Sequence, residues 1–292
     1  MFFRTIATFL ALLATSAFAQ VTLYGTVNAS GNSTLVRLDP ATGALLQTIG
    51  PVGYIINGLA VDPTTGTLYG STNSQTESCS SCLSRIVTIN TSTGAGTVVG
   101  PTGQSQVATI TFTPSGAMYG WSDIVTTPSE SDDLVSINKA TGAATWVADS
   151  GVSTGAQSFA INAAGVAYLF QSESTYTINL GTGLPTAAGS FTLPQVSDEF
   201  HHGTFHPSTG LMYGIDQIGS SNPRNMLVLN PATNAFVGAP IAIPNNIHTL
   251  AFAGAATTVG VPVDASWALA LLMLAIVGFV AFGMRRNSAN LA

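Results

Sequence analysis

The sequence is poor in charge. Asp, Glu, Lys and Arg together make up 7% of the 292 residues, whereas hydrophobic residues make up 46%. Intrinsic disorder needs the opposite balance, so the chain is expected to fold. Basic residues are the scarcest charged type, seven against thirteen acidic ones, which leaves a net charge of -6. This balance argues against nucleic-acid binding, because there is no basic patch to neutralise phosphates.

Cysteine is equally scarce. Two cysteines cannot make the disulfide framework of a chain this long. They stand as Cys79-Ser-Ser-Cys82, a spacing that allows either a redox pair or a local disulfide. No thioredoxin-like unit is predicted around them, so we predict a disulfide that pins a loop in an oxidising compartment. Phosphate-binding glycine loops and recognisable nucleophile turns are also missing from the sequence.

Residues 1–19 predict a secretory signal peptide. A single charge, Arg4, precedes the apolar stretch from Ile6 to Leu13, and the small residues of Ala17-Phe18-Ala19 follow it. A membrane span is the alternative, but the apolar stretch is shorter than a bilayer core requires. We therefore predict export, with cleavage after Ala19.

The other end of the chain predicts a transmembrane helix. The stretch from Trp267 to Met284 has no charge and is closed by Arg285 and Arg286. At about 1.5 Å per residue it just spans a bilayer core, and the arginine pair places its end in the cytoplasm. A buried C-terminal helix is the alternative, but the stretch has no polar face. We predict a linker and sorting motif at 256–266, the membrane helix at 267–284 and a basic cytoplasmic tail at 285–292.

This tail resembles the C-terminal sorting tails of Gram-negative bacteria that exosortases read, of the IPTL and PEP-CTERM-like kinds. Pro262, Ser266 and Trp267 carry the likeness to the motif Ile-Pro-Thr-Leu-Ser-Glu-Trp, although Ser266 and Trp267 are adjacent here. The resemblance implies a temporary anchor that a sorting protease removes on delivery to the cell surface or the extracellular matrix. A permanent single-span anchor is the alternative.

The region between the two ends, residues 20–255, is a repeat. A hydrophobic residue followed by Tyr recurs at Leu23-Tyr24, Leu68-Tyr69, Met118-Tyr119, Ala167-Tyr168 and Met212-Tyr213, with Tyr spacings of 45, 50, 49 and 45. Two sets of turn markers fall between these pairs. They are Asp39–Gly43, Asn90–Gly94, Asn138–Gly142, Asn179–Gly183 and Asn230–Asn234 in one set, and Asp62–Gly66, Thr113–Gly116, Asn162–Gly165 and His206–Gly210 in the other. Such turns between alternating apolar runs are typical of β-hairpins.

Four strands in a period of 40 to 50 residues predict a propeller blade. The pattern resembles the secreted bacterial β-propellers of the YVTN and NHL-like kind, a resemblance that implies the fold and not an activity. The strand Val21–Val27 and the unpartnered strand His248–Ala253 are expected to complete one blade. We therefore predict an all-β propeller of five four-stranded blades. A sixth, degenerate blade is one alternative, and an open solenoid or sandwich with exposed edges is another.

The turns also sort the two faces of the ring. The loops from strand one to two and from three to four are tight, whereas we expect the other two classes to be long and to share the opposite face. Ten of the thirteen acidic residues are assigned to these long loops: Glu77, Asp123, Glu130, Asp132, Asp133, Asp149, Glu173, Asp198, Glu199 and Asp216. They are either ordinary solvated charges or a surface that attracts calcium or a basic partner.

Aligning the inner strands gives one column at the mouth of the channel, on the long-loop face. It contains Asn57, Ala108, Gln157, His201 and His248. We hypothesise a ligand site made of Asn57, Gln157, His201 and His248. A divalent metal, calcium or zinc, could be held by His201, His202, His248, Asp198 and Glu199. The alternative is a wet channel lined by polar residues, with His206 only a turn residue.

These observations favour an exported binding or interaction module at the cell surface or matrix, with a glycan, a protein or another extracellular ligand. A metal-assisted hydrolase or lactonase at the channel mouth is the second candidate. Binding is preferred because no complete catalytic set can be named; glycosidases, for example, need two carboxylates that the column lacks.

Overall fold

The computed structural model describes residues 21–29, 31–72, 83–122, 133–152, 157–194, 199–217 and 224–254. All of them belong to one compact unit, Met1–Ala256. These residues form strands and turns and contain no helix, hence none that could cross a membrane. The predicted signal peptide, sorting motif, membrane helix and Cys79–Cys82 disulfide lie outside the described residues.

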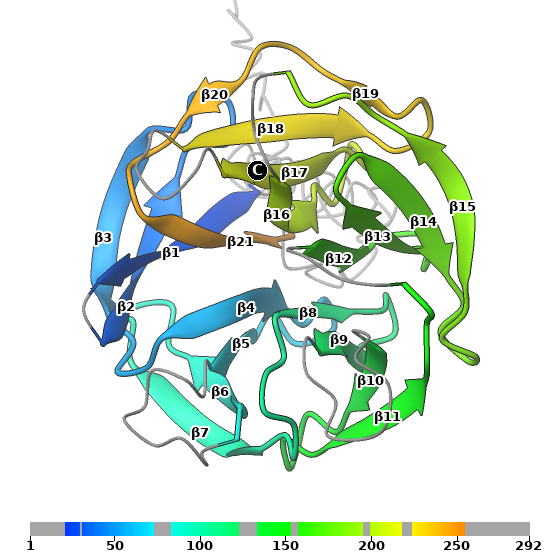
Figure 1. Cartoon of the computed structure of the whole chain (residues 1–292). Helices are drawn as coiled ribbons and strands as arrows, with labels where there is room; N and C mark the ends of the chain where they lie inside the picture. The colour runs from blue at the N-terminus through cyan, green and yellow to red at the C-terminus, as the bar shows by residue number, and fades with distance from the viewer. Residues whose placement is uncertain are drawn as a thin grey trace, which may run out of the picture. The chain divides into compact units, whose positions relative to one another are not determined.

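Five antiparallel sheets stand around a central axis as the blades of a propeller (Figure 1). The first blade has the order β21 (Ile247–Ala253), β1 (Thr22–Ala29), β2 (Asn32–Leu38) and β3 (Leu45–Pro51). The second consists of β4 (Ile56–Val61), β5 (Leu68–Thr72), β6 (Arg85–Ile89) and β7 (Gly96–Pro101), and the third of β8 (Thr109–Phe112), β9 (Met118–Ser122), β10 (Asp133–Ile137) and β11 (Ala144–Ala148). The fourth consists of β12 (Gln157–Ile161), β13 (Ala167–Gln171), β14 (Ser174–Ile178) and β15 (Pro185–Ser190). The fifth consists of β16 (Glu199–Phe205), β17 (Met212–Gln217) and β18 (Asn225–Asn230), with β19 (Ala235–Phe236) and β20 (Ile241–Ala242) both paired to β18.

The predicted closure of the ring is confirmed. β21 pairs with β1 in antiparallel register, with Leu23 opposite Phe252 and Gly25 opposite Leu250. The strand from the far end of the repeat region thus becomes the inner strand of the first blade. The blade count is five, so the six-blade and open-sheet alternatives are wrong.

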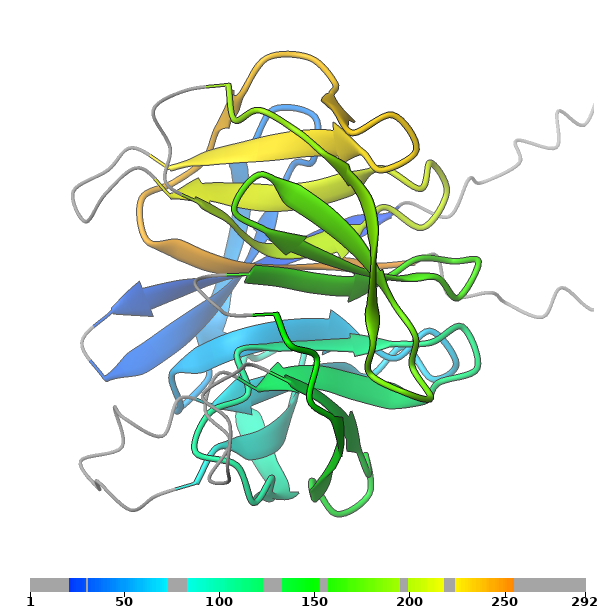
Figure 2. The same ribbon diagram turned by 45° about the vertical axis from the view of Figure 1, so that its right-hand side comes forward.

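The predicted tight turns are confirmed as well. In the second blade the Gly66 amide donates to the Asp62 carbonyl at 2.8 Å, and the Asp62 carboxylate accepts the Thr64 amide at 2.8 Å. Gly66 has a φ of 73°, a left-handed conformation that glycine adopts without strain. Figure 2 shows these turns between first and second strands projecting from one end of the ring, which we call the turn end.

The expectation that every other connection is long is wrong for two blades. β1 and β2 are joined by a two-residue turn, because Ala29 pairs with Asn32. β13 and β14 are joined in the same way, since Gln171 pairs with Ser174. Positive φ values at Gly31 and Ser172, 80° and 49°, make these tight hairpins possible.

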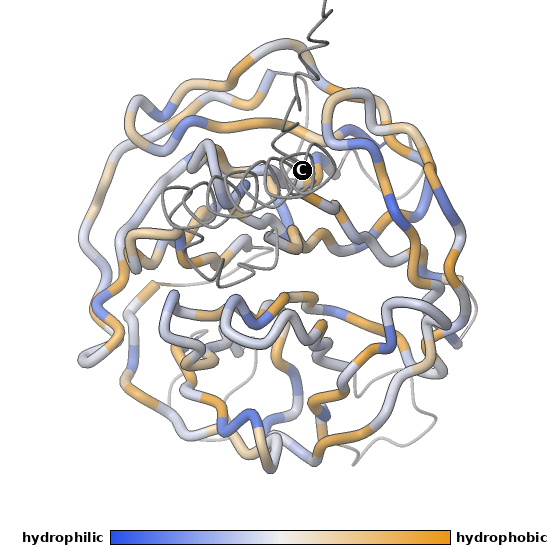
Figure 3. The backbone as a smooth tube through the Cα atoms, turned by 180° about the vertical axis from the view of Figure 1, so that it is seen from behind, coloured by the Kyte–Doolittle hydropathy of each residue, from blue (hydrophilic) through white to orange (hydrophobic). Residues whose placement is uncertain are grey.

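The core lies between neighbouring blades, and hydrophobic residues are spread over all five of them (Figure 3). The glycine that follows Tyr in four of the five repeats belongs to this packing. At Gly214, for example, an added Cβ would lie 2.5 Å from the Phe200 ring. A side chain at this position would therefore displace an aromatic ring that fills the space between blades four and five.

Hydroxyl groups also connect the inner strands of neighbouring blades. Thr111 Oγ1 accepts the Ile161 amide at 3.1 Å, Ser158 Oγ accepts the Gly203 amide at 2.7 Å, and Thr204 Oγ1 accepts the Phe252 amide at 3.3 Å. Each bond provides a partner for an amide on the edge of a sheet, where no further strand is available.

Candidate functional site

The predicted channel mouth corresponds to the end of the ring where the inner strands begin, opposite the turn end. Asn57 and His248 take equivalent places there, because each is an unpaired residue at a register shift in its strand. Ala108 directly precedes β8, and Gln157 begins β12. His201 is different, since it is paired with Ile215. The predicted column therefore holds for Asn57 and His248 but shifts by one residue in the fifth blade.

A β-bulge in β16 explains the shift. His202 and Gly203 are unpaired between His201 and Thr204. His202 has a φ of 43°, which is rare for a residue with a side chain. Gly203 cannot be replaced easily, because an added Cβ would lie 2.8 Å from the Tyr213 carbonyl oxygen. Bulges redirect side chains, and this one brings His202 beside His248.

Three imidazoles form a stack at this place. The His201 and His202 rings have centroids 5.4 Å apart with planes at 20°, and the His202 and His248 centroids are 4.5 Å apart. The Nδ1 atoms of His202 and His248 are buried without a hydrogen-bond partner. Buried polar atoms normally have partners, so these two nitrogens are exceptions that call for an explanation. We call His201, His202 and His248 the imidazole stack.

Arg224 adjoins the imidazole stack and is the functional residue that sequence reasoning missed. It directly precedes β18, and its Nη1 donates to the carbonyl of Ile247 at 2.6 Å, next to His248. The available signal was its rarity, as one of seven basic residues.

The charge state of the imidazole stack follows from burial and from Arg224. Burial lowers the pKa of His248 to about 4, and the charges of Arg224 and His201 contribute to this shift. Burial also lowers the pKa of His202 well below its usual range, with further lowering by His248, His201 and Arg224. Both rings are therefore neutral at pH 7, and each has one N–H donor and one acceptor nitrogen.

The metal hypothesis is not tested by these residues. Asp198 and the side chain of Glu199 lie outside the described part, as does the side chain of Gln157. Among the side chains that are described, no three of the types His, Cys, Asp and Glu are grouped so as to hold a metal ion. The Arg224 charge also opposes a dication at this place.

The acidic residues are placed differently from the prediction. Asp133 and Asp216 are buried strand residues, at 1% and 0% exposure, and Glu199 begins β16. Asp133 accepts hydrogen bonds from Trp146 Nε1 and the Ser150 amide, both at 2.9 Å. Carboxylates of Asp149 and Glu173 accept the amides of Gly151 and Leu193. Asp133 and Asp216 therefore do not belong to an open surface. Glu77, Asp123, Glu130, Asp132 and Asp198 lie outside the described residues, so the cation-attracting surface stays a prediction.

His206 is a turn residue, as the alternative interpretation proposed. Its Nδ1 accepts the Ser208 and Thr209 amides, both at 3.3 Å. Its ring meets the Phe252 ring at a centroid distance of 4.9 Å. These contacts occupy the imidazole at the turn end, so His206 is not part of the stack.

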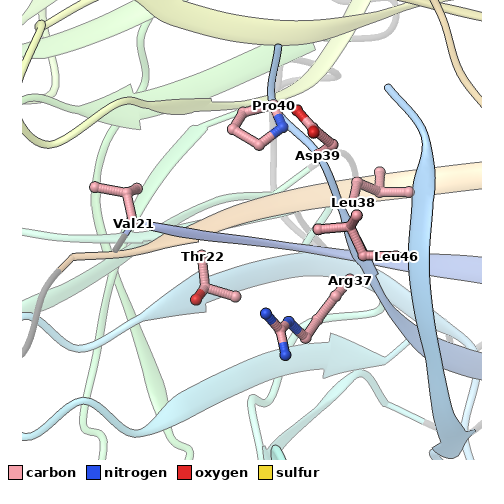
Figure 4. A pocket seen from close by; sticks show the side chains of 7 residues that line it. All are labelled: Val21, Thr22, Arg37, Leu38, Asp39, Pro40 and Leu46. Atoms are coloured by element: carbon pink, nitrogen blue, oxygen red, sulfur yellow. The ribbon is translucent and has the colours of Figure 1, made fainter. Parts of the chain in front are cut away.

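A pocket lies at the turn end of the first blade (Figure 4). It is lined by Val21, Thr22, Arg37, Leu38, Asp39, Pro40 and Leu46. The Asp39 carboxylate is already engaged with the amides of Ala41 and Thr42. Arg37 Nη1 donates to Gln47 Oε1 at 3.3 Å. The Asp39 carboxylate of this pocket thus serves the local turn, whereas the buried Arg37 Nε has no hydrogen-bond partner.

The fold is that of a β-propeller with five four-stranded blades. A chain of a nidogen/laminin complex is similar to it, with a TM-score of 0.54, 11% identity, and coverage of 80% of this chain and 98% of that one. A symmetrical protein studied for its de novo evolutionary emergence has a TM-score of 0.50, 14% identity, and coverage of 79% and 98%. TolB from Acinetobacter baumannii has a TM-score of 0.45, 11% identity, and coverage of 81% and 67%. No protein-family model and no curated protein matches the sequence. At these identities the structural likeness concerns the fold alone.

Proposed function

We propose that this propeller is an exported binding module whose channel mouth holds a carboxylate group of an extracellular ligand. The observation that carries the proposal is the imidazole stack beside Arg224, with two buried ring nitrogens that lack partners. Neutral imidazoles and a guanidinium together offer N–H donors and one positive charge. Arginine and carboxylate form strong, charge-assisted hydrogen bonds, so this donor set suits an anionic oxygen ligand.

The second candidate, a metal-assisted hydrolase or lactonase, rests on the same imidazoles. Two neutral rings with unpartnered nitrogens could bind zinc. Two considerations favour the anion: Arg224 is positive, and among the described side chains no three of the types His, Cys, Asp and Glu are grouped so as to hold a metal ion.

Export and surface sorting are part of the proposal. They rest on the signal-peptide pattern of residues 1–19 and on the tail with Pro262, Ser266, Trp267, Arg285 and Arg286. Mass spectrometry of the mature protein tests both. We expect an N-terminus at Gln20 and no peptide that contains Leu291 and Ala292. Recovery of that C-terminal peptide from the mature surface protein would replace the cleaved tail with a permanent anchor.

The binding site is tested by calorimetry on the full chain in detergent. The probes are a galacturonate oligomer, an acidic peptide, a neutral glucose oligomer and zinc alone. We expect an acidic probe to bind and the neutral one not to. Arg224→Gln should weaken this binding roughly 10- to 100-fold, the usual value of a hydrogen bond to a charged group. His206→Gln, outside the mouth, is the matched control and should bind like the wild type.

The zinc probe separates the two candidates. The double variant His202→Ala, His248→Ala removes both unpartnered nitrogens while Arg224 remains. Stoichiometric zinc binding that this variant abolishes, with no binding of either acidic probe by the wild type, would replace the binding module with the hydrolase. Acidic binding that is unchanged in Arg224→Gln would show that the ligand site lies elsewhere.

A further inference from the structure

Asp216 is the most unusual polar group among the described residues. Its side chain has 0% exposure, and neither carboxylate oxygen has a hydrogen-bond partner. It lies in β17, in the fifth blade, and plays no part in the imidazole stack. An ionised carboxylate without partners is far too costly to bury, so this group is either protonated or compensated by a cation.

Strand register shows which surface Asp216 faces. Asp216 pairs with Phe200 on one side and with Asn225 on the other. Directly paired antiparallel residues share a face of the sheet. Phe200 belongs to the aromatic cluster that packs blade five against blade four. The carboxylate therefore points into the interface between these two blades.

A second unpartnered oxygen faces the same interface from blade four. Thr175 has 0% exposure, and its Oγ1 has no hydrogen-bond partner. It pairs with Phe170, whose ring meets the Phe200 ring at a centroid distance of 5.7 Å. Asn225, also buried, adds a side-chain amide next to Asp216. Two unsatisfied oxygen groups and an amide thus lie around one aromatic contact, on opposing sheets.

Two other buried aspartates show what is missing here. Asp62 has 0% exposure and forms an ion pair with Lys139 at 2.6 Å. Asp133 has 1% exposure and accepts two N–H hydrogen bonds. In this chain a buried carboxylate is otherwise given a cation or N–H donors. The Thr175 hydroxyl and the Asn225 side-chain amide could donate to a carboxylate, yet neither Asp216 oxygen accepts a hydrogen bond from them. Their oxygen atoms are also ligands of a metal cation.

We propose that Asp216, Thr175 and Asn225 form a site for a monovalent alkali cation, sodium or potassium, between blades four and five. Oxygen ligands suit hard cations. Charge balance favours a monovalent cation over a divalent one. One carboxylate neutralises a single positive charge, whereas a divalent cation would leave a net positive charge beside Asp216, whose side chain has 0% exposure. The cation joins two neighbouring blades, so its binding stabilises the ring.

Thermal unfolding of the full chain in detergent tests the site. Choline chloride is replaced stepwise by sodium chloride or potassium chloride at constant ionic strength, so that screening does not change. We expect the Tm of the wild type to rise by about 3 to 5 °C for each tenfold increase in the concentration of the free cation, once that concentration exceeds the dissociation constant. In Asp216→Asn the charge is lost at nearly constant shape, and the Tm should not respond to the cation.

Two further variants keep the test decisive. Thr175→Val keeps the side-chain shape and leaves the Asp216 carboxylate in place, but it should reduce the rise of Tm with cation concentration. This variant tests the site even if Asp216→Asn does not fold. Asp133→Asn is the matched control: it also removes a buried carboxylate but should retain the full cation response. A wild-type Tm that does not change with cation concentration would mean that the Asp216 carboxyl group is buried in its neutral form. A Tm of Asp216→Asn that rises with cation concentration as much as that of the wild type would place the cation elsewhere. Stabilisation by calcium alone, lost in Asp216→Asn, would overturn the monovalent class.

Discussion

The two ends of the ring treat buried polar atoms in opposite ways. Among the described residues, ten buried side-chain atoms lack a hydrogen-bond partner. Eight of them are at the mouth end, on Gln104, Thr109, Trp121, Thr175, His202, His248 and Asp216, the last with two atoms. The remaining two, Arg37 Nε and Asn234 Oδ1, are at the turn end. The turn end is therefore built to be stable, and the mouth end keeps unsatisfied groups that a ligand or an ion can complete.

The turn end satisfies its polar groups locally. Asp62 illustrates this, because its carboxylate accepts the Thr64 amide and hydroxyl and also forms the ion pair with Lys139 of the next blade. Burial by itself raises the pKa of Asp62, but the hydrogen bonds from Lys139 and Thr64 and the Lys139 charge outweigh this, so that the pKa is lowered overall. The Nδ1 atoms of His202 and His248 at the mouth end have no such partners.

The largest expected effect is the loss of closure, which joins both ends. Deletion of Ile247–Ala253 removes the inner strand of the first blade, with Ile247, Leu250 and Phe252 buried at 0%, 1% and 7% exposure. Each such side chain contributes roughly 1.5 to 3 kcal/mol, so the deletion removes most of the stability of a typical domain. We expect no cooperative thermal transition in circular dichroism. A melting curve like that of the full chain would disprove ring closure.

Acid should weaken the mouth end next. The depressed pKa of His248, about 4, means that the unfolded state takes up a proton before the folded state does. Stability is therefore complete above about pH 6.5 and falls as the pH is lowered toward 4, by at most about 3 kcal/mol for this residue. Urea unfolding between these pH values measures the slope. His248→Gln should reduce the slope and leave the part that is due to the lowered pKa of His202. An unchanged slope in that variant would assign the acid sensitivity to other groups.

A smaller effect is expected at the turn end. Lys139→Met removes the cation from buried Asp62 and should cost about 2 kcal/mol, the usual range for a hydrogen bond to a charged group. Because the folded-state pKa of Asp62 is lowered, this stability is present above about pH 4 and is lost as the pH falls through the folded value. Chemical denaturation at pH 7 and pH 3 checks the sign. Equal losses at both pH values would contradict an ionic contribution.

The smallest effect concerns the axis itself. Thr204→Val removes the hydroxyl that accepts the Phe252 amide at 3.3 Å and leaves that amide without its partner. The expected cost is about 1 kcal/mol. Hydrogen exchange of the Phe252 amide should become faster, while the exchange of β9 and β10 in the third blade serves as the control. Unchanged protection at Phe252 would show that this bond does not hold the closing strand.

The sequence predicts the elements that depend on local chemistry. Turns such as Asp62–Gly66 and the Tyr-Gly repeat are visible because particular residues are needed at particular backbone angles and close contacts. The pairing of β21 with β1 was predicted because two incomplete blades complement each other.

The site was predicted only in part, for a physical reason. A β-bulge adds one residue to a strand without changing its hydrophobic pattern. Counting back from the turn therefore predicted that His201 is equivalent to Asn57 and His248, whereas His201 is paired with Ile215 and the unpaired residues are His202 and Gly203. Burial of Asp133 and Asp216 was not predictable, because charged residues in polar stretches are normally exposed. Arg224 is positioned by a carbonyl that lies in a different strand, and no local pattern records such a contact.

The pairing of Thr22 with Ala253 has a further consequence. The two strands that complete the first blade meet there at the turn end, so a short linker could join them and the chain could be opened at another tight turn. The blades of such a circular permutant would still follow one another in the same cyclic order. The fold therefore does not determine which blade comes first in the sequence; it determines only the order of the blades around the axis.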